Sequence, residues 1–198
     1  MDLERVIKTR RSIRRFKQIP LSMDFLVNLV DAGRLAPSGA NLQPIEYVIV
    51  NDKRICEKIF SALRWAGYIK PEWRPAEGER PVAYIVILVQ EGRSPFSDVD
   101  VGLSAENIML LAWSHGVGSC MLGNIDREMI REILGVPDGY RIHSVIALGF
   151  PAEKSVVEES DAVEYWRDED GVMHVPKRRI KDIVHINRFG CRGGDSNS

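Results

Sequence analysis

The sequence predicts a chain in which helices and strands are mixed, compatible with either α/β or α+β layering. Residues 82–89 form a run that is apolar on both faces, as expected of a central buried strand. Residues 98–115 form the most apolar helical segment, with apolar side chains around much of its circumference, so we expect it at the centre of the fold. The chain has no internal repeat and no linker long enough to divide it. Periodicity alone does not choose between the two fold classes.

The first quarter of the chain is expected to hold two helices and a strand. Apolar residues over 3–7 keep helical spacing. Ser22 is placed to cap a second helix, which ends before Pro37 because proline disfavours helical backbone in the residue before it. A loop rich in turn-forming residues follows over 36–44 and leads into a strand over 45–50.

Caps, periodicity and turn residues predict the rest of the chain. In order, we expect a helix starting at residue 51 or 52, an irregular segment over 65–80, a helix from its cap Asp126 to Leu134, a strand over 143–148, a hairpin over 165–175 turning at Asp170-Gly171, and a last helix over 180–187. One domain is expected over residues 1–190, followed by a disordered tail over 191–198.

Composition excludes several classes of protein. With 198 residues, 44% hydrophobic and 28% charged, the chain has globular composition. A formal net charge of −1 argues against a general nucleic-acid binder. No apolar run approaches the roughly 18 residues of a membrane helix, and the N-terminus has no apolar signal region. The three cysteines are widely spaced and odd in number, which fits a reducing cytoplasm without a disulfide framework.

The stretch T-R-R-S-I-R-R-F, residues 9–16, places four arginines around one serine. Charges of one sign this close repel each other, so the cluster predicts an anion, for which a phosphomonoester with about −1.5 to −2 charges is suited. On an extended segment Arg10 and Ser12 point one way and Arg11 the other, so not every arginine reaches one phosphate. Arg15 is therefore expected at the surface. Taken alone, such a run is more often a solvated helix end.

Signatures of other common chemistries are absent from the sequence. It contains no G-x-G-x-x-G after a strand, no P-loop and no G-x-S-x-G elbow. Its four histidines do not fall at metal-ligand spacings with the cysteines. These absences favour a bound cofactor as the source of the chemistry.

Several motifs in the same order resemble the FMN-dependent nitroreductase family. The likeness covers roughly residues 2–188, and a series of motifs in order is much more specific than any one of them. The motifs are Arg10-Arg11-Ser12, P-S-G-A-N-L-Q-P over 37–44, G-V-G-S-C-M-L-G-N-I-D over 116–126, G-V-P-D-G-Y…A-L-G-F-P over 135–151, and P-K-R-R over 176–179.

The resemblance implies an α+β, three-layer fold with a central, mainly antiparallel sheet flanked by helices, built as an intertwined homodimer with FMN at the subunit interface. It implies that the phosphate and ribityl chain contact Arg10, Arg11, Ser12, Lys177 and Arg179. It places Arg14 as a cation near the flavin pyrimidine, and the backbone of Leu122, Gly123 and Asn124 near the flavin N5. From the partner subunit it implies contacts by Pro37, Ser38, Gly39 and Asn41, with Gln43 nearby.

One departure from the family concerns the N5 loop. Many members carry a glutamate just before the glycine of this loop, whereas this chain reads Met121-Leu122-Gly123-Asn124. A backbone N–H can still donate to N5, but any role of that carboxylate is lost. The segment over 64–80, where the family sets substrate choice, matches no pattern; Trp65 and Tyr68 are candidates for a substrate lid, with ordinary aromatic packing as the alternative.

The leading functional hypothesis is an FMN oxidoreductase that uses NAD(P)H to reduce nitroaromatics, quinones or related electron-poor acceptors, by a ping-pong mechanism and without a catalytic side chain. Members of similar appearance also carry out flavin fragmentation and reductive dehalogenation. A second hypothesis is an FMN-binding carrier or sensor without turnover. A third, a nucleic-acid arm at the basic N-terminus, predicts a strongly salt-dependent affinity and interleaved aromatic residues that are mostly missing.

Overall fold

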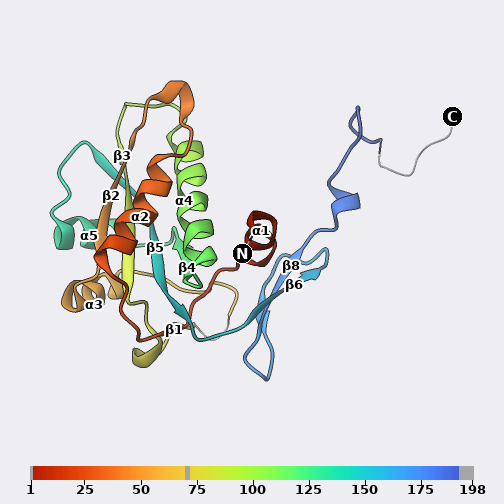
Figure 1. The fold of residues 1–198 in the computed structure, drawn as a ribbon, viewed down its shortest axis with the longest axis horizontal. Helices are drawn as coiled ribbons and strands as arrows, with labels where there is room; N and C mark the ends of the chain where they lie inside the picture. The colour runs from red at the N-terminus through yellow and green to blue at the C-terminus, as the bar shows by residue number, and fades with distance from the viewer. Residues whose placement is uncertain (1, 70–71, 192–198) are drawn as a thin grey trace.

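A five-stranded antiparallel sheet forms the middle of the molecule in the computed structural model, which describes residues 2–69 and 72–191 (Figure 1). Neighbouring strands run in the order β1-β5-β3-β2, and β4 also pairs with β5. The strands are β1 (Phe16–Lys17), β2 (Ile45–Val50), β3 (Ala83–Gln90), β4 (Gly118–Leu122) and β5 (Tyr140–Pro151). All of these pairings are antiparallel, which confirms the α+β class and excludes the α/β alternative.

Helices cover both faces of this sheet, so the body has three layers. On one face α2 (Met23–Arg34) packs against α4 (Ser97–Ser114), and on the other lie α3 (Lys53–Ser61) and α5 (Arg127–Leu134). The short α1 (Leu3–Thr9) sits beside α4. Among the described residues, three 3₁₀ turns complete the helical segments: η1 (Gly39–Asn41), η2 (Glu77–Glu79) and η3 (Ile180–Asp182). No helix among the described residues has the length and apolar character needed to cross a bilayer.

Strand β3 separates two hydrophobic cores. Tyr84, Val86 and Leu88 face the core beneath α3 and α5, whereas Ile85 and Ile87 face the core beneath α2 and α4. Because side chains alternate across a strand, a strand buried on both faces must be apolar throughout. The predicted central strand is thereby confirmed.

Local sequence signals set the helix boundaries. Ser22 caps α2 by accepting from the backbone N–H of Phe25, and Asp126 caps α5 by accepting from Met129. Asp52, the second of the two predicted start positions, caps α3. Gly135 ends α5 in the left-handed region at φ 63°, a conformation that glycine adopts without steric cost.

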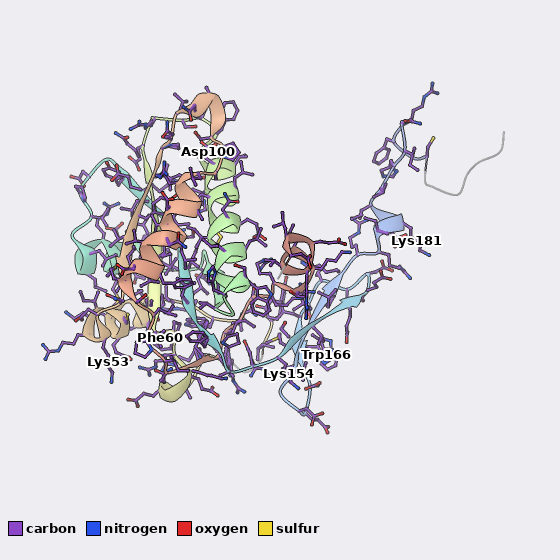
Figure 2. All side chains as sticks on the ribbon, viewed as in Figure 1. Lys53, Phe60, Asp100, Lys154, Trp166 and Lys181 are labelled. Atoms are coloured by element: carbon purple, nitrogen blue, oxygen red, sulfur yellow. The ribbon has the colours of Figure 1, made fainter. Side chains whose placement is uncertain are left out.

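A C-terminal arm extends from the body after β5 (Figure 1). It contains β6 (Ser155–Glu159), β7 (Trp166–Arg167) and β8 (Met173–Lys177), with β6 parallel and β7 antiparallel to β8. Figure 2 shows Lys154 and Trp166 near the base of the arm and Lys181 toward its end. The predicted hairpin is confirmed, with Gly171 at φ 78° in its turn.

One expectation for secondary structure fails, and several strands were missed. The predicted helix over 180–187 is wrong, because only η3 forms there. A short apolar segment needs a packing surface to remain helical, and its apolar side chains are exposed in the single chain: Ile180, Ile183, Val184 and Ile186. Strands β1, β4 and β6 were not predicted from the sequence. Of the expected tail, only Cys191 lies within the described residues.

Candidate functional site

The arginine-rich segment lies along β4 at the edge of the sheet. The backbone N–H of Ile13 donates to Ser119 O at 2.9 Å, and Ser12 forms an isolated parallel bridge with Ser119. A Cβ on Gly118 would lie 2.8 Å from Ile13 Cγ1, too close for a side chain. Gly118 is therefore what allows the segment to approach the strand.

Glu153 fixes the backbone of the same segment from the other side. Its side chain is 1% exposed and accepts from Arg167 Nη2 at 2.8 Å. It also accepts from the backbone N–H groups of Arg14 and Arg15. A buried carboxylate requires such donors, so Glu153 holds Arg14 and joins it to the base of the arm.

Arg14 is a buried cation, 9% exposed. Its guanidinium lies over the ring of Tyr165, and Tyr165 in turn meets Tyr68 edge-on. Within the described residues the guanidinium has no carboxylate partner, and its Nη1 is buried without a hydrogen bond. Buried charged donors are normally paired, so Arg14 has the character of a group that meets an anion or acceptor supplied by a ligand.

Arg10 and Arg11 have different surroundings. Arg10 Nε pairs with Glu106 Oε1 of α4 at 3.0 Å. Arg11 donates to the carbonyl oxygens of Lys8, at 2.7 Å, and of Arg10, which satisfies the C-terminal carbonyls of α1. Burial, followed by the charge of Arg10, lowers the pKa of Arg11. Arg11 thus caps α1 in the single chain, and the phosphate contacts of Arg10 and Arg11 both stay predictions. Arg15, expected at the surface, is partly buried and pairs with Glu79 at 3.2 Å.

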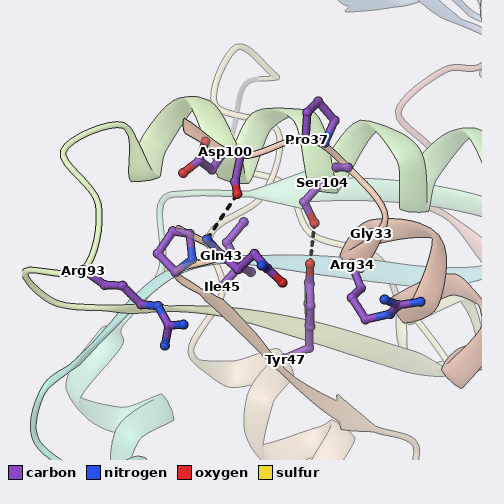
Figure 3. Close-up of a pocket in the computed structure, with 12 residues that line it drawn as sticks. Gly33, Arg34, Pro37, Gln43, Ile45, Tyr47, Arg93, Asp100 and Ser104 are labelled. Carbon is purple, nitrogen blue, oxygen red and sulfur yellow. Dashed lines mark hydrogen bonds between the residues drawn. The ribbon is translucent and has the colours of Figure 1, made fainter. Parts of the chain in front are cut away.

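The predicted turn-rich loop has an unusual backbone. Ala40, Asn41 and Gln43 all have positive φ, at 48°, 55° and 47°, a region that non-glycine residues seldom occupy. Ser38 Oγ accepts from the N–H of Gln43 at 3.1 Å. The loop borders a cavity of about 200 Å³, where Tyr47 Oη and Ser104 Oγ are 2.7 Å apart (Figure 3).

The candidate residues fall into three places in the single chain. The loop, with Pro37, Gly39 and Asn41, contacts the first turns of α4, whereas α1 and the arginine segment lie beside the other end of that helix (Figure 1). Lys177 and Arg179 lie on the arm, where Arg179 pairs with Asp161 and Asp182. The structure therefore places Arg10, Ser12 and Arg14 on one segment beside β4, but it does not join that segment to the loop in one chain.

The predicted N5 loop follows β4 directly. Leu122 is buried, whereas Gly123 and Asn124 are exposed. Gly123 O accepts from Arg127 Nη2 at 3.2 Å, and Asn124 O accepts from the N–H of Arg64 at 3.1 Å. Their carbonyl groups are thus turned toward protein donors. Burial raises the pKa of the neighbouring Cys120 thiol, which favours a structural role for it.

The two candidate lid residues differ in environment. Trp65 is 5% exposed and its ring packs near Phe60 in the core. Tyr68 is half exposed and touches Tyr165, which lies beside Arg14. A substrate contact is thus more accessible to Tyr68 than to Trp65, and both assignments stay predictions.

Sequence reasoning missed the partners that organise this site. Glu153, Glu106, Asp100 and Tyr165 each contact a predicted residue or loop. They are single acidic or aromatic residues far away in the chain, and acidic residues are common throughout it. No local pattern distinguishes them.

Comparison with known proteins supplies the class. The sequence profile of the Nitroreductase family matches residues 7–150. A protein of Archaeoglobus fulgidus provisionally named NADH dehydrogenase/NAD(P)H nitroreductase is 32% identical over 165 residues, which cover 79% of this chain and 90% of that protein. The iodotyrosine deiodinase of Thermotoga neapolitana is 26% identical, over 73% of this chain and 86% of that protein.

The fold comparison agrees. The structure of an FMN-dependent nitroreductase from Clostridium difficile R20291 superposes with a TM-score of 0.67 at 27% identity, covering 93% of this chain and 98% of that one. The α+β body and the matched profile define a nitroreductase-type fold. The chain belongs to the Nitroreductase family. The predicted family, fold class and enzyme class are thereby confirmed.

Proposed function

We propose that this protein is an FMN-dependent oxidoreductase that takes electrons from NAD(P)H and passes them to nitroaromatics, quinones or related electron-poor acceptors in a ping-pong cycle. The observation that carries the proposal is the buried guanidinium of Arg14, which has an unbonded Nη1 and no carboxylate partner among the described residues. The names of the family relatives support FMN and NAD(P)H as the cofactors.

The residues present fit FMN. Arg10 and Ser12, with Lys177 and Arg179 from the arm, offer cationic and hydroxyl donors to a phosphate. Arg14 offers a buried cation that suits the pyrimidine of the ring system, where negative charge develops on reduction. Gly123 and Asn124, exposed beside β4, leave room for a planar ring to approach the backbone.

Bound FMN supplies hydride acceptance from a nicotinamide and electron delivery to a second substrate. The chain's own residues would bind and orient the cofactor. Glu153 holds the backbone of Arg14 in place, and Tyr165 covers the guanidinium on its arm side. Preorganised charge of this kind needs no reorganisation during reaction. We expect no obligatory protein acid or base, because the cofactor carries the chemistry.

A homodimer is part of the proposal. Helix α4 is apolar around much of its circumference, yet Val99 and Leu103 are 63% and 42% exposed in the single chain, and a helix of this kind is normally covered on every side. The end of the arm is likewise apolar and exposed, up to 93% at Phe189. A second copy could cover both surfaces and bring its loop to the arginine segment.

The deciding experiment is anaerobic reduction of the purified, FMN-loaded protein by NADH or NADPH, followed by visible absorption. Rapid bleaching, then reoxidation by a quinone or nitroaromatic, is the expected result. Parallel double-reciprocal lines in steady-state rates test the ping-pong order. A stable yellow protein that neither nicotinamide bleaches would instead favour an FMN carrier or sensor. Sedimentation that gives a monomer with full FMN occupancy would refute the interface site.

Two further expectations belong to this proposal. The FMN-binding domain is taken to span residues 1–190. A cytoplasmic location is supported by three free cysteines, of which Cys56 and Cys120 are buried, because free thiols suit a reducing compartment.

A further inference from the structure

Asp100 is a buried carboxylate in the first turns of α4. It is 2% exposed, although carboxylates are seldom fully buried unless paired. Its two hydrogen bonds come from neutral donors: Oδ1 accepts from the backbone N–H of Gly39 at 2.8 Å, and Oδ2 accepts from Ser94 Oγ at 3.1 Å. Within the described residues no Lys or Arg forms an ion pair with it.

The first of these bonds ends on the loop with the unusual backbone. Gly39 begins the turn that contains Ala40, Asn41 and Gln43, all at positive φ. Residues held in such conformations persist only where the surroundings impose them. The loop's own bonds, from Asn41 N to Ser38 O and from Leu42 N to Gly39 O, close the turn but do not attach it to the body.

Attachment comes from the segment that leads into α4. Arg93 Nε donates to Leu42 O at 2.7 Å, at the far end of the turn from the bond between Asp100 and Gly39. Phe96 packs so closely that a Cβ on Gly39 would lie 2.5 Å from its ring. Residues 93–100 therefore hold the loop at both ends by hydrogen bonds, and the ring of Phe96 packs against it between these two bonds.

The other acidic residue at the start of α4 provides a contrast. Asp98 is exposed and pairs with Arg141, away from the loop. Both carboxylates benefit from the positive end of the helix dipole, but only Asp100 reaches the loop. Burying a carboxylate is unfavourable unless it is hydrogen-bonded. The burial of Asp100 is therefore explained by its bonds to the loop and to Ser94, and not by its place in the helix alone.

We propose that Asp100 is a positioning residue that holds the loop over 36–43 in its left-handed conformation, ready to contact FMN before the cofactor binds. Arg93 is the second point of attachment. This inference rests on the proposed function for the identity of the ligand. The attachment of the loop by Asp100 and Arg93 is a property of the chain itself, so it can be measured without FMN.

The test uses the full chain with four variants: Asp100→Ala, Asp100→Asn, Asp98→Ala and Arg93→Gln. Hydrogen exchange of the amides in residues 36–43 is measured without FMN, and FMN affinity is measured by quenching of its fluorescence. Urea unfolding of each variant confirms that it is folded under the assay conditions.

Asp100→Ala removes the acceptor for the Gly39 amide. We expect exchange over 36–43 to accelerate about tenfold or more and FMN to bind about 10- to 100-fold more weakly, the range for loss of a charge-assisted hydrogen bond. Asp100→Asn keeps an oxygen at the same place and should restore most of both values. Asp98→Ala removes a charge from the same helix terminus and should change neither.

Unchanged loop exchange in a folded Asp100→Ala protein would overturn the proposal. Equal losses in Asp98→Ala would overturn it too, since they would trace the effect to the helix terminus. Failure of Asp100→Asn to restore the loop would refute the role of the acceptor oxygen. If Asp100→Ala does not fold, Arg93→Gln, at an exposed position, provides the test. Loss of the bond from Arg93 to Leu42 O should then give faster exchange around Leu42.

The outcomes also separate this inference from the proposed function. If wild-type protein does not bind FMN but its loop exchange still depends on Asp100, the proposed function is rejected and the attachment of the loop by Asp100 stands. If wild-type protein and Asp100→Ala bind FMN equally tightly, the proposed function stands. The proposal that Asp100 prepares the loop for FMN is then rejected, whatever the loop exchange shows.

Discussion

The guanidinium carbon of Arg14 lies 4.6 Å from the ring centroid of Tyr165, so a buried cation of the N-terminal segment is covered by an aromatic residue of the C-terminal arm. The cation–π contact and the bonds of Glu153 fix this cation without neutralising it at its own side chain. A fixed and uncompensated cation attracts electrons toward a neighbouring redox group.

Arg14→Gln should lower the midpoint potential of bound FMN by on the order of 30–60 mV, since about 30 mV corresponds to 1.4 kcal/mol for a two-electron couple. Dye-equilibrated reductive titration measures this shift. Arg15→Gln is the matched control, because Arg15 pairs with Glu79 instead. An unshifted potential in Arg14→Gln protein with FMN bound would remove Arg14 from the flavin site.

Arg10 and Glu106 allow a test with opposite signs. Arg10→Glu should weaken FMN binding about 100-fold or more, because an attractive charge at the phosphate becomes repulsive. Glu106→Gln releases Arg10 from its 3.0 Å pair and should tighten binding. Titration with FMN and with riboflavin, which has no phosphate, measures both effects. Arg5→Glu on the exposed side of α1 is the control, and equal loss for FMN and riboflavin would contradict phosphate recognition by Arg10.

Leu103 tests the covering of α4 by a second copy. Leu103→Glu places a charge on the exposed apolar face of the helix, and burying an unpaired charge in an interface is strongly unfavourable. Sedimentation velocity should show a monomer, with FMN lost at the same time. Ile55→Glu on α3, at a position that is also partly exposed, should leave the dimer intact. A Leu103→Glu dimer with unchanged stability would place the interface elsewhere.

Local signals in the sequence predicted the body of the fold well. The caps Ser22, Asp52 and Asp126, and the alternation along β3, are determined by neighbours within a few residues. The arm was harder to predict. Its apolar segment over 180–187 has helical spacing but no surface within the chain to pack on, so spacing alone gave the wrong element.

The candidate site shows the same division. Arg10, Ser12 and Arg14 could be chosen because charge and family likeness single them out. Glu153 and Asp100 could not, because each acts through a backbone N–H more than 60 residues away along the chain. Such contacts depend on tertiary structure and leave no pattern in the sequence.

Gly118 tests how closely the arginine segment must approach β4. Gly118→Ala puts a Cβ 2.8 Å from Ile13 Cγ1, and overpacking of this kind costs about 1–3 kcal/mol of the free energy of unfolding. Urea denaturation measures the loss. Gly78→Ala, at an open position, is the control. Ile13→Ala also destabilises, because Ile13 is buried in the core, but the two substitutions together should cost less than the sum of their separate losses. Strictly additive losses would show that the contact does not matter.

His174 gives the arm a defined dependence on pH. Its Nε2 is 2.9 Å from Asp168 Oδ2, its Nδ1 bonds to Glu158, and its ring stacks on Trp166. The hydrogen bond to Asp168, followed by that to Glu158, raises the pKa of His174. The folded state therefore binds this proton more tightly than the unfolded state. The resulting stability is present below the ordinary histidine pKa of about 6.5 and is lost as pH rises through the raised value.

We therefore expect the arm to become less stable as pH rises from about 6.5 through the raised pKa of His174. The fluorescence of Trp166 during urea titrations measures this change. His174→Gln should remove this dependence. His143 is the control of opposite sign: burial, followed by the charge of Arg141, lowers its pKa, so it costs stability as pH falls below about 6.5. His143→Gln should leave the alkaline loss unchanged. An alkaline loss that survives in His174→Gln would trace the pH dependence to another group.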